Sequence, residues 1–314
     1  MSDDRAARDA EAQRSSVGQP GAAESGDAPR PLPAHDFGGR GSLIHLAHAN
    51  GYPPGTYRAM VAPLLIHHRV LGLPARPFWP GADWQAFEHW RQLGDDLLAG
   101  LDRIGAASVI GIGHSLGGVA TMYAATLQPE RFRALILIEP VLLPPMALRI
   151  FDLGLHHAVE RIPLVRGARQ RRDRWPSREA AFAHLRPKPV FARIPDAVLW
   201  DYVEHGLVPD GAAAAELTLA CPRDWEARIY ATPPTDVWRV LPRLLPPTLA
   251  LRGADSDTIS TASWHKWQRL QPQARFVDLD GLGHLLCFED PGRVAAEIER
   301  FLEDLARDSA AIAP

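Results

Sequence analysis

Cysteine is scarce in this chain, which has only two, Cys221 and Cys287, among 314 residues. Two cysteines cannot build a disulfide framework, and neither belongs to a Cys-x-x-Cys pair. The scarcity argues against a disulfide-stapled secreted scaffold and against a cysteine-based metal site, and it fits a reducing cytoplasm. We expect Cys287 to be a small apolar residue of the core.

Long apolar runs are also absent. No stretch of about 18 consecutive apolar residues occurs, so we expect no membrane-spanning helix and no stable membrane insertion. The N-terminal residues contain no apolar segment behind a basic start, which argues against a secretory signal. Together these features predict a cytoplasmic protein.

A surplus of positive charge is lacking too, because the formal net charge is −3 and the pI is about 6.5. This balance gives no reason to expect nucleic acid or an anionic membrane surface as a partner. Arginines do gather locally between Arg161 and Arg178, but no other part of the chain carries a matching basic stripe. We interpret that cluster as a solvated helical surface.

Large apolar residues are nearly missing from the two ends of the chain. Residues 1–36 are rich in Ala, Asp, Arg, Ser and Gly, a composition that cannot offset the entropy lost on ordering. We predict a disordered tail over residues 1–36 and a loose C-terminus over residues 309–314.

Between the two ends, short apolar runs alternate with segments of helical periodicity. The runs occupy residues 42–51, 68–77, 107–113, 133–140, 247–253 and 274–281, and helices are expected over residues 83–105 and 292–307. Hydrophobic residues make up 46% of the chain, enough for a large core. This alternation predicts an α/β fold with a mostly parallel central sheet and helices on both faces.

The alternation breaks down between residues 141 and 240. That stretch is rich in Pro, Trp and Arg and has mainly helical composition. We therefore predict a core made of residues 37–140 and 241–308, with residues 141–240 inserted as a mainly helical cap over the sheet. Some of its aromatic residues are candidates for lining a substrate cleft.

The motif "GIGHSLGG" at residues 111–118 surrounds Ser115 with glycines, between an apolar run and a segment of helical composition. A strand-to-helix turn is the setting in which Gly-x-Ser-x-Gly exposes a nucleophilic serine. Side chains at positions 113 and 117 would collide with neighbouring backbone in such a turn. Gly113 and Gly117 therefore have a steric reason to be glycine.

A serine hydroxyl is a poor nucleophile unless a base, itself oriented by an acid, lies within hydrogen-bond reach. His284, in the turn after the last expected strand, is the histidine best placed by chain order. The acid is expected after the run at 247–253, where Asp257 is preferred and Asp255 is an alternative. Glu139, directly after the run "RALILI", is the third candidate.

The motifs "GHSLGG", "LRGADSDTIS", "GLGH" and "HANGYPPGTY" resemble those of the α/β-hydrolase superfamily over about residues 40–305. The resemblance implies a catalytic triad of Ser115, Asp257 and His284. It also implies an oxyanion hole formed by the backbone amides of Tyr52 and Leu116, and no cofactor. The chain departs from the pattern at Asn50, where many relatives have histidine.

His45 and His48 raise the question of a metal site. On a strand, their three-residue spacing would direct the side chains to opposite faces, so we expect no metal there.

The sequence therefore predicts a serine hydrolase that cleaves a carboxylic ester, or a related acyl bond, of a small molecule. Two alternatives stay open: carbon–carbon bond hydrolysis or lyase chemistry by the same triad, and a catalytically silent ligand-binding protein. The acyl and alcohol groups of the substrate and the oligomeric state are not determined by the sequence, because many chemistries share one fold.

Overall fold

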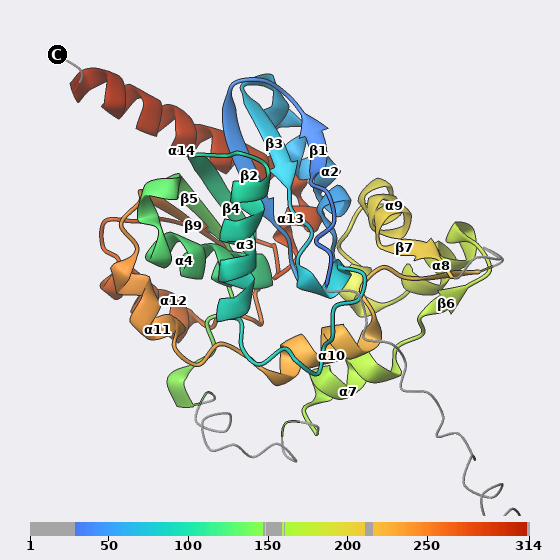
Figure 1. Ribbon diagram of the computed structural model, residues 1–314. Coiled ribbons are helices and arrows are strands. Elements are labelled where there is room, and N and C mark those ends of the chain that lie inside the picture. Colours follow the sequence, from blue (N-terminus) through green and yellow to red (C-terminus); the bar gives the residue numbers. More distant parts are fainter. Residues whose placement is uncertain (1–28, 147, 149–158, 160, 211–215, 313–314) are drawn as a thin grey trace, which may run out of the picture.

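The computed structural model describes residues 29–146, 148, 159, 161–210 and 216–312, and a seven-stranded sheet runs through its centre (Figure 1). The order is β1-β3-β2-β4-β5-β9-β10; β1 is antiparallel to β3, and the other neighbouring strands are parallel. The strands are β1 (His35–Gly38), β2 (Ser42–Ala47), β3 (His68–Gly72), β4 (Val109–His114), β5 (Phe132–Ile138), β9 (Thr248–Gly253) and β10 (Arg275–Leu279). The predicted mostly parallel sheet is confirmed.

Successive residues of the strands bury their side chains on opposite faces of this sheet. In β5, Leu135 and Leu137 belong to one hydrophobic core, whereas Ile136 and Ile138 belong to the other. The first core lies under α3 (Arg91–Arg103), α4 (Leu116–Leu127) and α12 (Thr261–Leu270), and the second lies under α2 (Arg58–Val61), α13 (Leu286–Glu289) and α14 (Pro291–Ile312) (Figure 1). Helices thus cover both faces, as the near-continuous apolar runs require.

The first long helix is shorter than its expected range of 83–105, because α3 begins only at Arg91. The side chain of Gln92, in the first turn of α3, accepts hydrogen bonds from the backbone N–H groups of Glu88 and His89, which precede the helix. Such local bonds offer the backbone an alternative to the helix. Hydrophobic periodicity alone does not reveal this competition.

The segment 141–240 contains helices and a small antiparallel sheet in the order β6-β8-β7. Its elements are α7 (Pro163–Gln170), β6 (Arg174–Trp175), α8 (Arg178–Leu185), α9 (Asp196–His205), β7 (Leu207–Pro209), β8 (Leu217–Leu219), α10 (Arg223–Ala231) and α11 (Val237–Val240). The prediction of a mainly helical cap did not include this sheet. Its strands have two or three residues, which is too short to show an alternating pattern. Residues 147, 149–158, 160 and 211–215 of this segment lie outside the described residues.

Regular structure extends into both ranges that were predicted to be loose. Strand β1 begins at His35, inside the range assigned to the tail, and pairs with β3. Helix α14 continues to Ile312, so the chain is helical where a loose end was expected from residue 309. Residues 1–28 and 313–314 lie outside the described residues.

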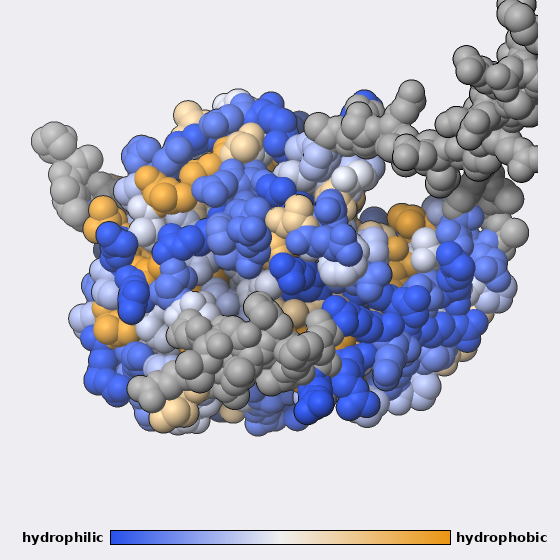
Figure 2. All heavy atoms as spheres, turned by 60° about the horizontal axis from the view of Figure 1, so that its bottom comes forward, coloured by the Kyte–Doolittle hydropathy of each residue, from blue (hydrophilic) through white to orange (hydrophobic). Residues whose placement is uncertain are grey.

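The surface is mostly hydrophilic over the face shown in Figure 2, with hydrophobic residues in small separate groups. Large exposed apolar side chains include Ile66, Met146 and Leu245. Within the described residues, no helix has the length and apolar character needed to cross a membrane.

Candidate active site

Ser115 lies in the tight turn between β4 and α4, where its φ of 54° falls in the left-handed region. A Cβ on Gly113 would lie 2.5 Å from the Gly117 carbonyl oxygen, and a Cβ on Gly117 would lie 2.1 Å from that of Ala47. Neither approach is tolerable for real atoms, so the predicted steric reason for both glycines is confirmed. In this turn the start of α4 packs closely on the end of β2. A serine with strained backbone in such a turn is typical of functional sites.

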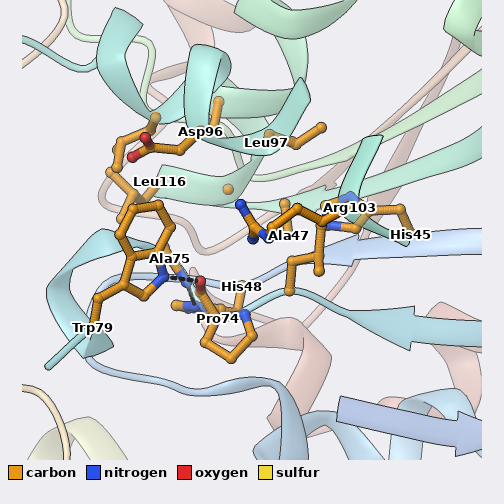
Figure 3. Close-up of a pocket in the computed structure, with 14 residues that line it drawn as sticks. His45, Ala47, His48, Pro74, Ala75, Trp79, Asp96, Leu97, Arg103 and Leu116 are labelled. Atoms are coloured by element: carbon orange, nitrogen blue, oxygen red, sulfur yellow. Dashed lines mark hydrogen bonds between the residues drawn. The ribbon is translucent and has the colours of Figure 1, made fainter. Parts of the chain in front are cut away.

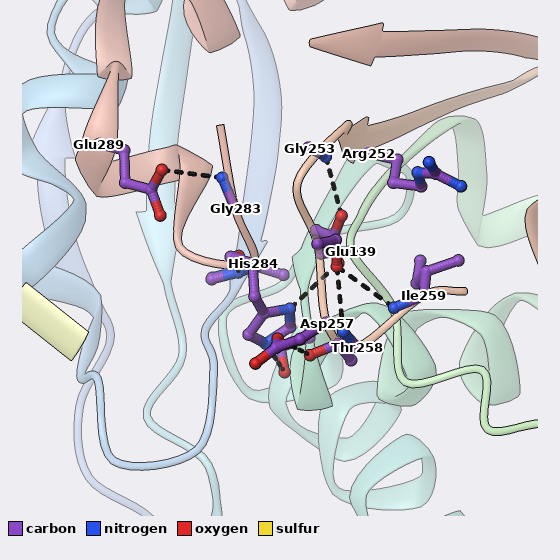
Figure 4. A network of polar contacts seen from close by, with 12 residues as sticks. Glu139, Arg252, Gly253, Asp257, Thr258, Ile259, Gly283, His284 and Glu289 are labelled. Atoms are coloured by element: carbon purple, nitrogen blue, oxygen red, sulfur yellow. Dashed lines mark hydrogen bonds and ion pairs between the residues drawn. The ribbon is translucent and has the colours of Figure 1, made fainter. Parts of the chain in front are cut away.

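His284 reaches Ser115 from the loop between β10 and α13. Its Nε2 lies 3.0 Å from the Ser115 Oγ, and its Nδ1 lies 3.1 Å from Oε2 of Glu139 (Figure 4). An ionised carboxylate can only accept, so Nδ1 carries the hydrogen in the neutral imidazole. Nε2 is then free to accept the serine hydroxyl proton.

Glu139 follows the last residue of β5 and is fully buried, with a φ of 47°. Its backbone N–H donates to the Leu251 carbonyl of the neighbouring strand β9 at 2.9 Å. The carboxylate accepts from the Gly253 amide at 2.8 Å and from the Ser256 hydroxyl at 2.6 Å, besides His284 (Figure 4). A buried charge needs such partners, and three donors converge on this one.

The structure does not bring the preferred acid, Asp257, to the histidine. Asp257 is exposed, and its carboxylate accepts from the Thr258 hydroxyl at 3.3 Å. Asp255 instead forms an ion pair with Arg193, 3.0 Å away. The preference for Asp257 is therefore corrected on geometry: Gly253, the last residue of β9, and Ser256, in the turn after it, donate to Glu139, whereas the two acids of that turn are exposed.

The two expected oxyanion donors stand in different environments. Leu116 is the first residue of α4, and N–H groups in the first turn of a helix have no acceptor within the helix. The Tyr52 N–H, by contrast, donates to the Ala49 carbonyl at 3.2 Å. Both residues belong to segments that meet beside Ser115, since Gly117 packs on Ala47 and His48.

A cavity lies between the end of β2, α3 and α4, beside the serine turn (Figure 3). Leu116 and Gly117 line it, but Ser115 does not. His45 and His48 both line it, which corrects the expectation that they face opposite sides. His48 lies beyond the last residue of β2, so the strand alternation does not extend to it.

The two histidines differ in their hydrogen bonds. His48 donates from Nδ1 to the Ala49 carbonyl at 2.8 Å. It accepts at Nε2 from the Ala75 N–H at 2.9 Å (Figure 3). Neither ring nitrogen of His45 has a hydrogen-bond partner among the described residues. Burial lowers the pKa of His45 to about 3 and that of His48 to about 4, so both rings are neutral at pH 7.

No group of three metal-ligating side chains occurs among the residues that the structure describes. Cys287 is buried in the core, as expected, and burial raises the pKa of its thiol well above the usual value. Cys221 is also buried, so neither thiol is presented as a nucleophile.

The segment 141–240 contacts the loop after β2. The Tyr52 ring lies between Phe288 of α13, at a centroid distance of 5.1 Å, and Tyr202 of α9, at 5.0 Å. Asn50 donates from Nδ2 to the Glu226 carbonyl of α10 at 3.2 Å. This contact is made by Asn50, the position at which the sequence was expected to depart from the superfamily pattern.

A partly buried ion pair lies beside this contact, between Arg171 and Glu226 at 2.7 Å. Arg171 also donates to the Tyr202 hydroxyl at 3.0 Å. The arginine charge is thus compensated within the cap segment.

Comparison with known proteins identifies the fold class. A family model described as "Alpha/beta hydrolase family" matches residues 43–297. The chain therefore belongs to the alpha/beta hydrolase family, which places it among the hydrolases. A search of curated protein sequences gives no significant match.

Several solved structures are similar in fold. E-2-(acetamidomethylene)succinate hydrolase has 18% identity and a TM-score of 0.72, over 88% of this chain and 98% of that one. The enol-lactonase from Burkholderia xenovorans LB400 has 18% identity and a TM-score of 0.62, over 86% and 96%. A thermophilic esterase from Thermogutta terrifontis has 21% identity and a TM-score of 0.63, over 87% and 93%.

Proposed function

We propose that the protein is a serine hydrolase that cleaves a carboxylic ester or a related acyl bond through an acyl-enzyme. The observation that carries this proposal is the continuous chain of hydrogen bonds from the Ser115 Oγ through His284 to Glu139. In this chain Ser115 is the nucleophile, His284 is the general base and Glu139, in place of Asp257, is the orienting acid.

The geometry supports a two-stage reaction. In the first stage the Ser115 Oγ bonds to the acyl carbon while its proton moves to the His284 Nε2, and the carbonyl electron pair moves onto oxygen. When that pair returns, the bond to the leaving group breaks, and the imidazolium gives its proton to the departing oxygen. In the second stage water attacks the acyl-enzyme with the same proton transfers, and the free acid leaves.

The buried Glu139 stabilises this cycle in two ways. It fixes the tautomer of His284 that leaves Nε2 as the acceptor, and its negative charge stabilises the imidazolium formed in each stage. Because the carboxylate is anchored by Gly253 and Ser256 as well, it is held in place when the histidine changes charge.

The oxyanion is proposed to bind at the Leu116 amide and at the loop after β2. Each such donor typically lowers the barrier by about 3 kcal/mol. The Tyr52 amide would take part only by sharing or giving up its long bond to the Ala49 carbonyl. Both donors are backbone groups, so the proposal does not depend on the side chain at position 50.

The cap segment is proposed to select the substrate, because Tyr52 contacts Tyr202 of α9 beside the site. Solved relatives of this fold are named for hydrolysis of an ester, a lactone and a substituted succinate, which agrees with acyl chemistry. We expect a small-molecule substrate and no cofactor, with the reaction in the cytoplasm.

The test is a series of p-nitrophenyl esters of increasing acyl length, assayed with the wild type and with Ser115→Ala. The proposal expects turnover for at least one ester and a loss of more than about a thousandfold in the variant. Equal rates for the two proteins would contradict it. If a fluorophosphonate labels Ser115 but no ester is cleaved, the carbon–carbon hydrolase or lyase alternative gains support. No labelling would favour the silent binding protein.

A further inference from the structure

His114, the residue directly before Ser115, is fully buried and joins two other parts of the site through its ring. Its Nε2 lies 3.0 Å from the backbone carbonyl oxygen of His284, and its Nδ1 lies 2.8 Å from the Tyr57 hydroxyl. Tyr57, in η1 (Pro54–Tyr57), is fully buried as well. Its oxygen lies 2.9 Å from the backbone nitrogen of Ala49.

Donor and acceptor chemistry fixes the direction of every bond in this chain. A carbonyl oxygen can only accept, so the His114 Nε2 carries the hydrogen and donates to His284. Burial lowers the pKa of His114 to about 3, so the ring is neutral and Nδ1 must accept from the Tyr57 hydroxyl. The Tyr57 oxygen in turn accepts from the Ala49 N–H. Within this series of bonds, the two ring nitrogens of His114, the Tyr57 hydroxyl and the Ala49 N–H each have a partner.

The backbone carbonyl of Ala49 is held as well. Its carbonyl accepts from His48 at 2.8 Å and from the Tyr52 N–H at 3.2 Å. The backbone N–H and C=O of Ala49, in the loop proposed to supply an oxyanion donor, are therefore both anchored.

We propose that His114 and Tyr57 are positioning residues that hold the serine turn, the His284 loop and the loop after β2 in one arrangement. The proposal rests on the proposed function, since it concerns the same site. Neither side chain touches the reacting atoms. His114 acts through the backbone of His284, and Tyr57 acts through the backbone of Ala49.

Tyr57→Phe removes one hydroxyl and leaves the ring packing in place. It deprives the Ala49 N–H of its acceptor and the His114 Nδ1 of its donor. We expect kcat to fall about 10- to 100-fold with little change in KM, because small misplacements of catalytic groups are costly in the transition state. A merely structural role would lower thermal stability and leave kcat per folded molecule unchanged.

Tyr123→Phe is the matched control. The Tyr123 ring is buried in α4 and its hydroxyl donates to Asp236, so this variant also loses a tyrosine hydroxyl bond, away from the triad. Its kcat should equal that of the wild type. A fall in kcat as large as that of Tyr57→Phe would overturn the proposal.

Two substitutions of His114 separate the two bonds of its ring. Asparagine places an acceptor near the former Nδ1 and keeps the Tyr57 bond, whereas glutamine places a donor near the former Nε2 and keeps the His284 bond. If these bonds act as one series, Tyr57→Phe should lower kcat by a smaller factor in His114→Gln, where the bond between residues 114 and 57 is already lost, than in His114→Asn, where that bond is kept. If Tyr57→Phe does not fold, the single variants His114→Asn and His114→Gln still test the proposal through their own kcat, because each loses one of the two ring bonds.

The decisive experiment measures kcat and KM of these variants on an ester that the wild type cleaves and Ser115→Ala does not. Wild-type turnover with an unchanged kcat in Tyr57→Phe would overturn the positioning role and leave the hydrolase function standing. Independent, multiplicative effects in both double variants would likewise contradict a connected chain. Absence of wild-type turnover would instead refute the proposed function itself.

Discussion

Glu139→Gln is the substitution that discriminates most sharply between the acids available to His284. Each of the three groups that meet the carboxylate is a donor: the Gly253 amide, the Ser256 hydroxyl and the His284 Nδ1–H. Glutamine offers one accepting oxygen, and its NH₂ group must face a former donor. It therefore favours the His284 tautomer with hydrogen on Nε2, which cannot accept the serine proton.

The expected loss follows from this tautomer change. Replacing the orienting carboxylate of a Ser-His-acid triad by its amide lowers kcat by about ten-thousandfold, which corresponds to about 5 kcal/mol of transition-state stabilisation. The fold should survive, because one unsatisfied buried hydrogen bond costs about 1–3 kcal/mol. Thermal unfolding monitored by circular dichroism separates the two effects.

Asp257→Asn is the matched control. Asp257 is exposed, and substitutions at such sites change stability by about 0.5 kcal/mol or less. Its ester turnover should stay within about twofold of the wild type, because its carboxylate bonds the Thr258 hydroxyl and not His284. A severe defect in Asp257→Asn together with a mild one in Glu139→Gln would refute the reasoning, because it would mean that the acid reaches His284 from the turn after β9.

Acid should destabilise the fold, because burial lowers the pKa of His45, His48 and His114 to about 3, 4 and 3 while the unfolded chain protonates them near pH 6.5. Their stability contribution is full above pH 6.5 and is lost as pH falls toward 4, by up to about 1.4 kcal/mol per pH unit for each ring. Urea titrations at several pH values measure that slope. His45→Gln should reduce this pH dependence of the free energy of unfolding by the contribution of one histidine. A slope equal to that of the wild type would contradict a buried, neutral His45. Gly117→Ala should disrupt the serine turn and abolish turnover, because its Cβ would lie 2.1 Å from a carbonyl oxygen. Gly167→Ala, whose Cβ would meet nothing within 4 Å, should instead raise the free energy of unfolding by about 0.5–1 kcal/mol. Melting temperatures of the two purified variants check this pair, and equal values would contradict it.

The serine turn could be predicted from sequence because its constraint is local. Gly113, Ser115 and Gly117 are close in the chain, and the collision that requires Gly113 arises within the turn itself, whereas the one that requires Gly117 involves Ala47, at the end of β2. His284 could be predicted from chain order, since it lies in the turn after the last strand. Both residues are brought together in the structure, with 3.0 Å between the reacting atoms.

The acid could not be chosen from sequence because two strand ends compete for one position. Strands β5 and β9 are parallel neighbours, so Glu139 and the turn containing Asp257 meet at the same edge of the sheet. Which carboxylate turns inward depends on the left-handed backbone at Glu139 and on the donors of Gly253 and Ser256. One signal was available: a glutamate directly after a fully apolar run is a charge that the fold must bury.

The missed strands have a different cause. Strand β1 has four residues and lies beside a polar segment, and the strands of the small sheet have two or three. Runs this short show no usable period, and their pairing depends on segments distant in the chain. The His114–Tyr57 bond was missed for the same reason, because the two residues are 57 positions apart.

The central claim is that Ser115 is an activated nucleophile, and covalent labelling tests it most directly. The wild-type protein is incubated with a fluorophosphonate, its intact mass is measured, and the modified peptide is mapped. The account predicts one adduct per chain on Ser115, lost in Ser115→Ala and strongly slowed in Glu139→Gln but not in Asp257→Asn. An unlabelled wild-type protein, or equal labelling of Ser115→Ala, would contradict it.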